Sequence, residues 1–380
     1  MEKMMKTSET KTKRQGNFEL LRIISMVMIV TLHYLKKGGL LSANEGSVVY
    51  YFAWALEALC LISVNSYVFI SGYFTKTKTF KLNKMLDLWI QTLFISICIY
   101  LIAGKAGVIK GFTWDSFLAS FLPITTNSYW FITTYFVFLA IAPFLVYITD
   151  SINQYQHKIV VFTLLFITSV LPTVFFKVEW LRISKGYHIV WFITLFFLAS
   201  YIRKYDCFKR KPTVYGLLYF LCCTAAFALR FAVKAVSLHF YKKDLGETFF
   251  MRYNMFFIFL ASLFLFLAFK NISIKGEKIN KLITFFSSAA VYVYIIHEAP
   301  SIRTYYWKNI VKPTACNSML DLLLNYIVSV GAIYIGCTLI GKLLVFLYKL
   351  IRADRLTIFV SNKITGFVKR KIITDNEKAG

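Results

Sequence analysis

The titratable residues of one apolar segment are the first candidates for chemistry in this sequence. The segment FELLRIISMVMIVTLHY contains Glu19, Arg22 and His33 among largely apolar residues. Arg22 and His33 are eleven residues apart, close to three whole turns of a helix, so their side chains would share one helix face about 16 Å apart along its axis. A near-neutral imidazole suits general-base or nucleophilic chemistry. We predict one groove lined by both side chains.

Both residues also have structural interpretations. Arg22 lies about one turn from the start of the segment, where it could pair with Glu19 at i, i+3 or extend to lipid phosphate. His33 lies near the other end, where a histidine can serve only as a hydrogen-bonding residue. Position alone leaves these alternatives open.

A second set of titratable side chains is predicted at a depth similar to that of His33. Ionisable groups inside a bilayer are costly, so they mark either a functional path or a buried structural pair. The two arginines of this set could instead pair with one of its glutamates. The predicted outer-half residues are Glu57, Arg230, Arg252, His297 and Glu298.

The elements that would position these residues are membrane-spanning helices. The residues AVILMFWYC make up 58% of the 380 residues and charged residues only 16%, which excludes an ordinary soluble domain. Apolar runs near the ~20 residues of a spanning helix recur along the chain. We predict an all-α polytopic membrane protein with about ten spans, at 17–35, 48–74, 85–103, 128–148, 158–176, 188–202, 213–235, 249–269, 284–298 and 319–350.

The excess of basic residues fits a membrane protein better than a nucleic-acid-binding one. The net charge is +26, but no nucleic-acid-binding motif accompanies it, and the cations lie mainly between the spans. Of 44 Lys and Arg, 27 fall in the segments that share a side with the N-terminus and 13 in the opposite loops. This bias predicts both termini in the cytoplasm, and membrane lipids rather than nucleic acid as partners.

The domain organisation follows from these spans. We predict a basic cytoplasmic segment at 1–16, one transmembrane domain at 17–350 and a basic cytoplasmic tail at 351–380. The motifs HExxH, GxxxxGK[ST], GxSxG and GxGxxG are absent, which disfavours an ATPase or a metalloprotease and predicts no metal.

Four segments, taken in order, resemble the membrane acyltransferase 3 family, whose members O-acylate bacterial surface carbohydrates. ELLRIISMVMIVTLH (19–33) is similar to the opening helix of that family, including the spacing of its Arg and His. FISGYF (69–74) with the following FKLNKML, SYWFITTYFVFLAIAPFL (128–145) and VYVYIIH (291–297) are similar to three later segments. Lys81 and Lys84 stand where the family usually has an arginine pair, which retains charge but not the bidentate guanidinium.

The resemblance implies transfer of an acyl group, most often acetyl from acetyl-CoA, to a sugar hydroxyl of a surface polysaccharide such as a capsule, or of a lipid-linked glycan. It assigns His33 and Arg22 to the active site and adds Trp130 to the outer-half residues. The basic loop with Lys76, Lys78, Lys81 and Lys84 would attract the CoA phosphates, although anionic lipid is an equal alternative. A transporter or a non-enzymatic component of polysaccharide export is the alternative function.

The predicted topology can be tested by thiol labelling from outside the cell. Single cysteines at Ser42 and at Thr12, in a variant without the native cysteines, should differ in reactivity toward a membrane-impermeant reagent. Labelling is expected only at position 42, because the count of cations places position 12 in the cytoplasm. Labelling at position 12 alone would reverse the topology.

Overall fold

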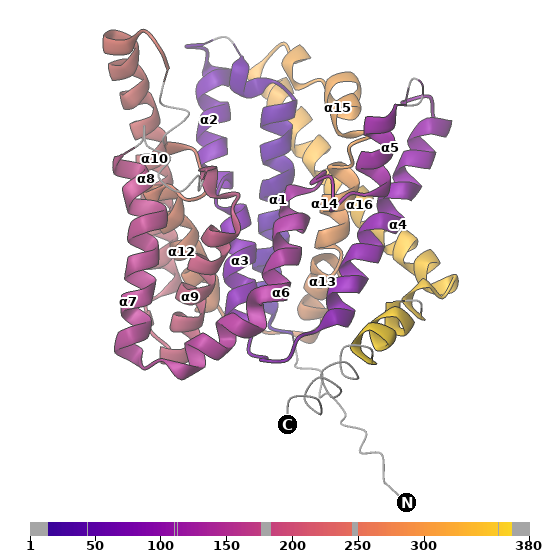
Figure 1. Ribbon diagram of the computed structural model, residues 1–380. Helices are drawn as coiled ribbons and strands as arrows, with labels where there is room; N and C mark the ends of the chain where they lie inside the picture. Colours follow the sequence, from indigo (N-terminus) through magenta and orange to yellow (C-terminus); the bar gives the residue numbers. More distant parts are fainter. Residues whose placement is uncertain are drawn as a thin grey trace, which may run out of the picture.

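Figure 1 shows a computed structural model of the chain, a bundle of long helices. No strand occurs among the residues that the structure describes, which are 14–366 without 44, 110, 112, 176–183, 245–249 and 356. The protein is therefore an all-α polytopic membrane protein, as predicted. Most of the predicted N-terminal segment and the last part of the predicted tail lie outside the described residues.

Helix α1 (Gly16–Lys37) is central to the half of the bundle that contains the candidate site. It packs against α2 (Val48–Cys60), α3 (Ser63–Phe74), α12 (Phe256–Lys270), α13 (Glu277–Ser287), α14 (Ala290–His297) and α16 (Met319–Leu350). We call the end of the bundle at which α1 begins the near face, and the end at which it finishes the far face.

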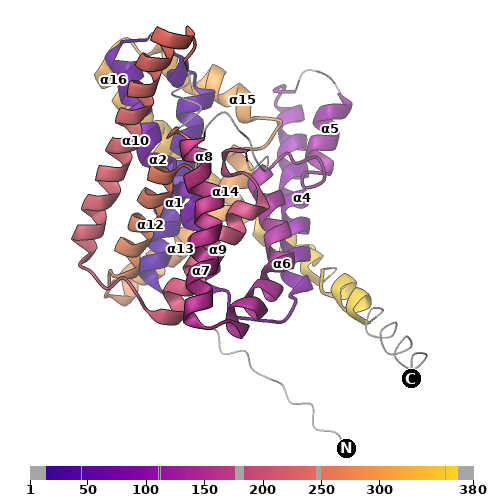
Figure 2. The same ribbon diagram turned by 60° about the vertical axis from the view of Figure 1, so that its left-hand side comes forward.

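The remaining helices surround this centre (Figure 2). Helices α4 and α6 lie beside α14 and α9, respectively. Helices α7 and α10 lie on the side of the molecule away from α4, at the left of Figure 1. Their bounds are α4 Leu82–Lys105, α5 Trp114–Phe121, α6 Trp130–Ser151, α7 Gln154–Leu165, α8 Leu171–Val174, α9 Ile189–Tyr205, α10 Pro212–Tyr241 and α15 Arg303–Tyr306.

Eight of the ten predicted spans coincide with helices that are long and apolar enough to cross a membrane, within the described residues. The other two predicted spans, 188–202 and 249–269, correspond to the shorter helices α9 and α12. The count of ten therefore remains a prediction. The span predicted at 284–298 begins earlier, at Glu277, because α13 adds a polar first turn that the apolar pattern does not reveal.

Described residues beyond the last span contact the bundle. Residues 353–355 and 357–366 are helical, although this region was predicted only as a basic tail. The buried Thr357 hydroxyl lies 3.0 Å from the Tyr348 hydroxyl, and the Ser361 hydroxyl donates to the Asn83 side chain at the start of α4.

Gly72 permits close packing of α3 against α9. A Cβ atom at this position would lie 3.0 Å from the Phe196 Cα and 3.1 Å from the Ala199 Cβ. Since the first of these is a backbone atom, a side chain at position 72 would force the two helices apart.

We expect Gly72→Ala to lower the thermal stability of the detergent-solubilised protein, at a cost of about 1–3 kcal/mol from overpacking. Gly331→Ala in α16 is the control, because a Cβ there meets no atom within 4 Å. Its better helix propensity should leave stability equal or slightly higher. A Gly72→Ala protein as stable as Gly331→Ala would contradict the close packing.

Candidate active site

Two histidines from helices far apart in the sequence meet at the far-face ends of α1 and α14. The Nδ1 of His33 lies 2.8 Å from the Nε2 of His297, and their ring centroids are 5.0 Å apart. His297 is buried, whereas the His33 side chain retains 19% of its exposure. The contact forms because the apolar faces of α1 and α14 pack together and bring the last turns of both helices to the same depth.

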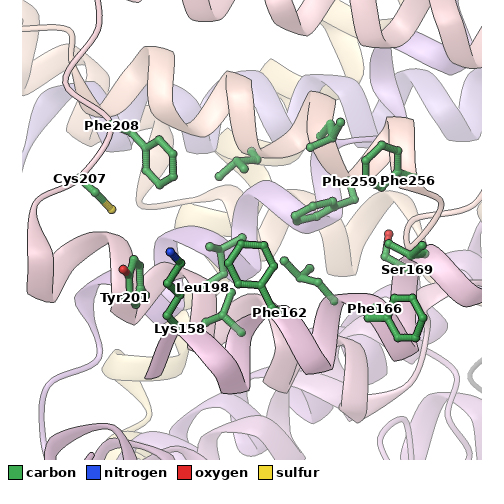
Figure 3. Close-up of a pocket in the computed structure, with 15 residues that line it drawn as sticks. Lys158, Phe162, Phe166, Ser169, Leu198, Tyr201, Cys207, Phe208, Phe256 and Phe259 are labelled. Atoms are coloured by element: carbon green, nitrogen blue, oxygen red, sulfur yellow. The ribbon is translucent and has the colours of Figure 1, made fainter. Parts of the chain in front are cut away.

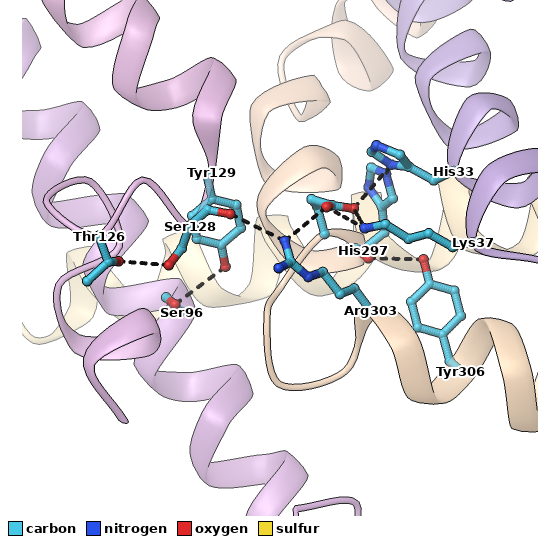
Figure 4. Close-up of polar contacts among 10 residues, drawn as sticks. His33, Lys37, Ser96, Thr126, Ser128, Tyr129, His297, Arg303 and Tyr306 are labelled. Atoms are coloured by element: carbon cyan, nitrogen blue, oxygen red, sulfur yellow. Dashed lines mark hydrogen bonds and ion pairs between the residues drawn. The ribbon is translucent and has the colours of Figure 1, made fainter. Parts of the chain in front are cut away.

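Glu298 follows α14 directly, and its carboxylate connects His33 to the cations of Lys37 and Arg303. Figure 4 labels these three partners. Its carboxylate accepts hydrogen bonds from the Lys37 ammonium at the end of α1, and its Oε1 lies 3.2 Å from a guanidinium nitrogen of Arg303. Its Oε2 is 3.3 Å from the His33 Nδ1. A carboxylate this buried needs such partners, since an unpaired buried charge is costly.

The hydrogen-bond partners assign the protons of the two rings. The Val293 carbonyl oxygen, 2.5 Å from His297 Nδ1, can only accept, so this nitrogen carries a proton. The Nε2 of a neutral His297 is then an acceptor, and His33 Nδ1 donates to it, with Glu298 as a second acceptor. The Nε2 of His33 is left unprotonated, and no described residue hydrogen-bonds to it. This nitrogen is available as a base or nucleophile.

The same three residues also have the composition of a metal site. Their ligand atoms, from His33, His297 and Glu298, all lie within 4.8 Å of one another. However, both oxygens of Glu298 already accept hydrogen bonds from cationic side chains, and these would repel a metal ion. The donor set fits a hydrogen-bonded network better than a metal centre.

Tyr306 forms a hydrogen bond with the backbone at the end of α14. Its hydroxyl donates to the His297 carbonyl oxygen at a distance of 3.0 Å. Burial raises the pKa of Tyr306, so the phenol stays protonated at neutral pH and keeps donating.

A cavity of about 530 Å³, the far cavity, opens beside His33 and contains most of the predicted outer-half residues. His33, Glu57, Trp130, Arg252 and Glu298 all line it. Its other polar or aromatic lining residues, which the sequence did not single out, are Lys36, Lys37, Ser42, Trp54, Lys185, Tyr187 and Tyr253. Burial raises the pKa of Tyr187, so this phenol also remains a donor at neutral pH.

Arg230 does not line the far cavity, in contrast to the prediction. Its guanidinium carbon lies 3.5 Å from the ring centroid of Trp54, on a ring that does line the cavity, and a guanidinium nitrogen lies 3.9 Å from an Asp244 oxygen. The predicted alternative that Arg230 pairs with Glu57 or Glu298 is not what the structure shows. Arg230 instead supports the wall of the cavity from behind by a cation–π contact.

Arg22 lines a different cavity, of about 240 Å³, which we call the near cavity. The predicted pair with Glu19 is present, with a guanidinium nitrogen 2.6 Å from Oε1, and Arg14 lies 3.6 Å from the other oxygen. Arg14 also lines this cavity. The expectation of one groove shared by Arg22 and His33 is therefore wrong, because the face of α1 that carries both residues is divided between two cavities.

The partition between the cavities is formed by neighbouring residues of the same helices. On α6, Trp130 lines the far cavity and Phe131 the near cavity. On α1, Ile29 lines the near cavity and His33, one turn later, the far cavity. His33 thus lies on the far side of the partition, one turn from the near cavity.

The four lysines of the basic loop lie between α3 and the first turn of α4, on the near face. Lys78 is 3.0 Å from an Asp150 oxygen and also lies over the ring of Tyr147. None of the four lysines lines the far cavity or the near cavity.

Sequence reasoning does not select Lys37 or Arg303, because both lie outside the predicted spans. The signal that could have identified Lys37 is its spacing from His33, four residues along the same helix face.

A third cavity, of about 530 Å³, is an apolar groove between α7 and α12 (Figure 3). Lys158 lies in its wall, and phenylalanine side chains form much of the rest. This groove is lined by none of the predicted site residues.

Comparison with known proteins identifies the group to which this bundle belongs. The sequence model of the acyltransferase 3 family, described as an acyltransferase domain, matches residues 15–342. Neither the curated proteins nor the solved structures include a match to the chain. The matched range contains both histidines and every residue that lines the near and far cavities except Arg14. Because it covers most of the sequence, the chain belongs to the acyltransferase 3 family of membrane acyltransferases.

Proposed function

We propose that this acyltransferase moves an acetyl group from cytoplasmic acetyl-CoA to a hydroxyl of a cell-surface polysaccharide sugar, in the plasma membrane. The observation that carries the proposal is that His33 lines the far cavity one turn beyond Ile29, which lines the near cavity. A donor that enters from one face and an acceptor that enters from the other would meet at this side chain. The far face is then the outer surface, in agreement with the predicted topology.

The near cavity suits the donor. Two arginines, Arg14 and Arg22, lie at its near-face part, and its deeper lining contains apolar side chains such as Met26 and Ile29. The rise from Arg22 to His33 is about 16 Å, of the order of an extended pantetheine arm. Arg22 would hold the polar part of the donor while the thioester reaches toward the histidine pair.

His33 can act as a general base in this arrangement. Its free Nε2 takes the proton of the sugar hydroxyl, and the oxygen attacks the thioester carbonyl. The carbon–sulfur bond then breaks, and the leaving thiolate recovers the proton from the imidazolium. Glu298 contributes by orienting the ring through Nδ1 and by stabilising the positive charge that His33 carries between the two steps.

A second version uses the same nitrogen as a nucleophile. His33 Nε2 attacks the thioester carbonyl, the carbon–sulfur bond breaks, and the CoA thiolate leaves. The sugar hydroxyl then attacks the acetyl group on the imidazole, the carbon–nitrogen bond breaks, and the hydroxyl proton passes to the thiolate. Both versions require an unprotonated Nε2 on His33 and a cavity on each side.

Replacement of His33 should remove turnover and retain the fold. We expect His33→Ala and His33→Gln to lower kcat by about 10² or more, because the base that activates the acceptor is lost. The rate is measured as thiol release from acetyl-CoA and as acetylation of surface polysaccharide in cells. His239→Ala, at an exposed histidine of α10, is the control. A stably inserted His33→Ala protein with normal turnover would disprove the role of His33.

The basic loop should contribute to donor affinity. Replacing Lys81 and Lys84 by Gln is expected to raise the KM for acetyl-CoA in a salt-sensitive manner, because the near-face charge that attracts the CoA phosphates is reduced. Lys275→Gln with Lys278→Gln removes the same charge from another exposed near-face loop and serves as the control. Equal KM values for the two double variants would favour lipid as the partner of the basic loop.

A further inference from the structure

The far cavity carries an excess of positive charge. Its lining contains four cations and two carboxylates: Lys36, Lys37, Lys185, Arg252, Glu57 and Glu298. Glu298 is already bonded to Lys37 and, from outside the lining, to Arg303. The imbalance is therefore not cancelled by the carboxylates of the cavity.

Two of these cations line the cavity without an ionic partner among the residues that the structure describes. Lys36 and Lys185 are both exposed, and neither forms an ion pair with any residue in the described part of the chain. They come from different elements, since Lys36 is in the last turn of α1 and Lys185 is in the short turn 184–186 before α9. A favourable interaction with the C-terminal end of α1 could account for Lys36 but not for Lys185.

The turn that carries Lys185 is fixed by packing. Lys185 has a left-handed φ of 63°, which is unfavourable for a residue with a side chain, and Gly186 follows with φ 77°. A Cβ on Gly186 would lie 2.7 Å from the Tyr253 Cβ and 3.0 Å from the Asn254 backbone nitrogen. The turn is thus pressed against the segment before α12, and this contact holds Lys185 at the cavity.

Aromatic rings supply a second feature of the lining. Trp130 lies stacked on Tyr253 at 5.8 Å between centroids and meets Tyr187 edge-on at 4.3 Å. Trp54 is backed on one face by Arg230, so its orientation toward the cavity is supported. Rings of this kind offer large, rigid apolar surfaces beside polar groups, a combination suited to the apolar faces and hydroxyl groups of a sugar.

We propose that the acceptor bound in the far cavity is an anionic sugar, in which a phosphate or carboxylate group is held by Lys36 and Lys185 while the ring lies against the aromatic side chains. The proposal rests on the proposed function in one respect, that the molecule in this cavity is the acyl acceptor. The two lysines would determine specificity, whereas His33 performs the chemistry.

Binding to matched sugars tests this directly and requires no donor. The probes are N-acetylglucosamine 1-phosphate, glucuronic acid and neutral N-acetylglucosamine, titrated into the full-length protein in uncharged detergent. Tryptophan fluorescence is the readout, since Trp54 and Trp130 line the cavity. We expect at least one anionic probe to bind about tenfold more tightly than the neutral sugar, and the preference to decline with salt. Whichever anionic probe binds more tightly relative to the neutral sugar identifies the bound group as phosphate or carboxylate.

The variant Lys36→Gln/Lys185→Gln should lose the preference for the anionic probe. Lys308→Gln/Lys312→Gln is the matched control, because it removes the same charge from exposed residues at the far face that line none of the three cavities. Equal affinity of the wild-type protein for anionic and neutral probes would overturn the proposal. A double variant that keeps the preference would also overturn it.

Two further measurements separate this proposal from the proposed function. The dissociation constant for CoA should be unchanged in Lys36→Gln/Lys185→Gln. If CoA binding is lost instead, the far cavity takes the donor, and the proposal is wrong. A protein that prefers the anionic probe but never cleaves acetyl-CoA would refute the proposed function and leave the anion site in place.

Discussion

The bonding of Glu298 to its partners is the interaction on which the site depends. This carboxylate is buried, and it is stabilised by a cation from α1 and another from the segment after α14. Its contact with His33 links the network to the face of α1 that contributes residues to both cavities. Loss of the carboxylate would leave Lys37 and Arg303 close together without their shared counterion, which would disrupt the histidine pair as well.

One face of α1 contributes residues to two separate cavities, and the proposed function depends on this division. Arg22 and His33 share that face, but apolar side chains of α1 and α6 separate the spaces that they line. Such a partition would limit the access of water to a thioester in the near cavity, where hydrolysis would compete with transfer. Under the proposed function, the reactive group must lie close to this partition, and His33 is one turn from it and in contact with His297.

The sequence predicted much of the fold and part of the site. Spans were predictable because a bilayer requires long apolar helices, and titratable residues at one depth were predictable because few such residues occur within spans. The division into two cavities was not predictable, since it depends on which side chains of α6 fill the space beside α1. The position of Arg230 behind Trp54 likewise depends on how α10 packs against α2, which no local pattern specifies.

The thin partition has a consequence for the electric field of the membrane. Ile29 and His33 line opposite cavities and are about 6 Å apart along α1, far less than the thickness of the bilayer. If water fills both cavities, most of the transmembrane voltage falls across this short distance. The free energy of an elementary charge that crosses this distance would change by about 2.3 kcal/mol per 100 mV of membrane voltage. His33 lines the far cavity, so a proton that reaches it from the far face crosses little of this voltage, whereas a charged group that passes between the two cavities would cross nearly all of it.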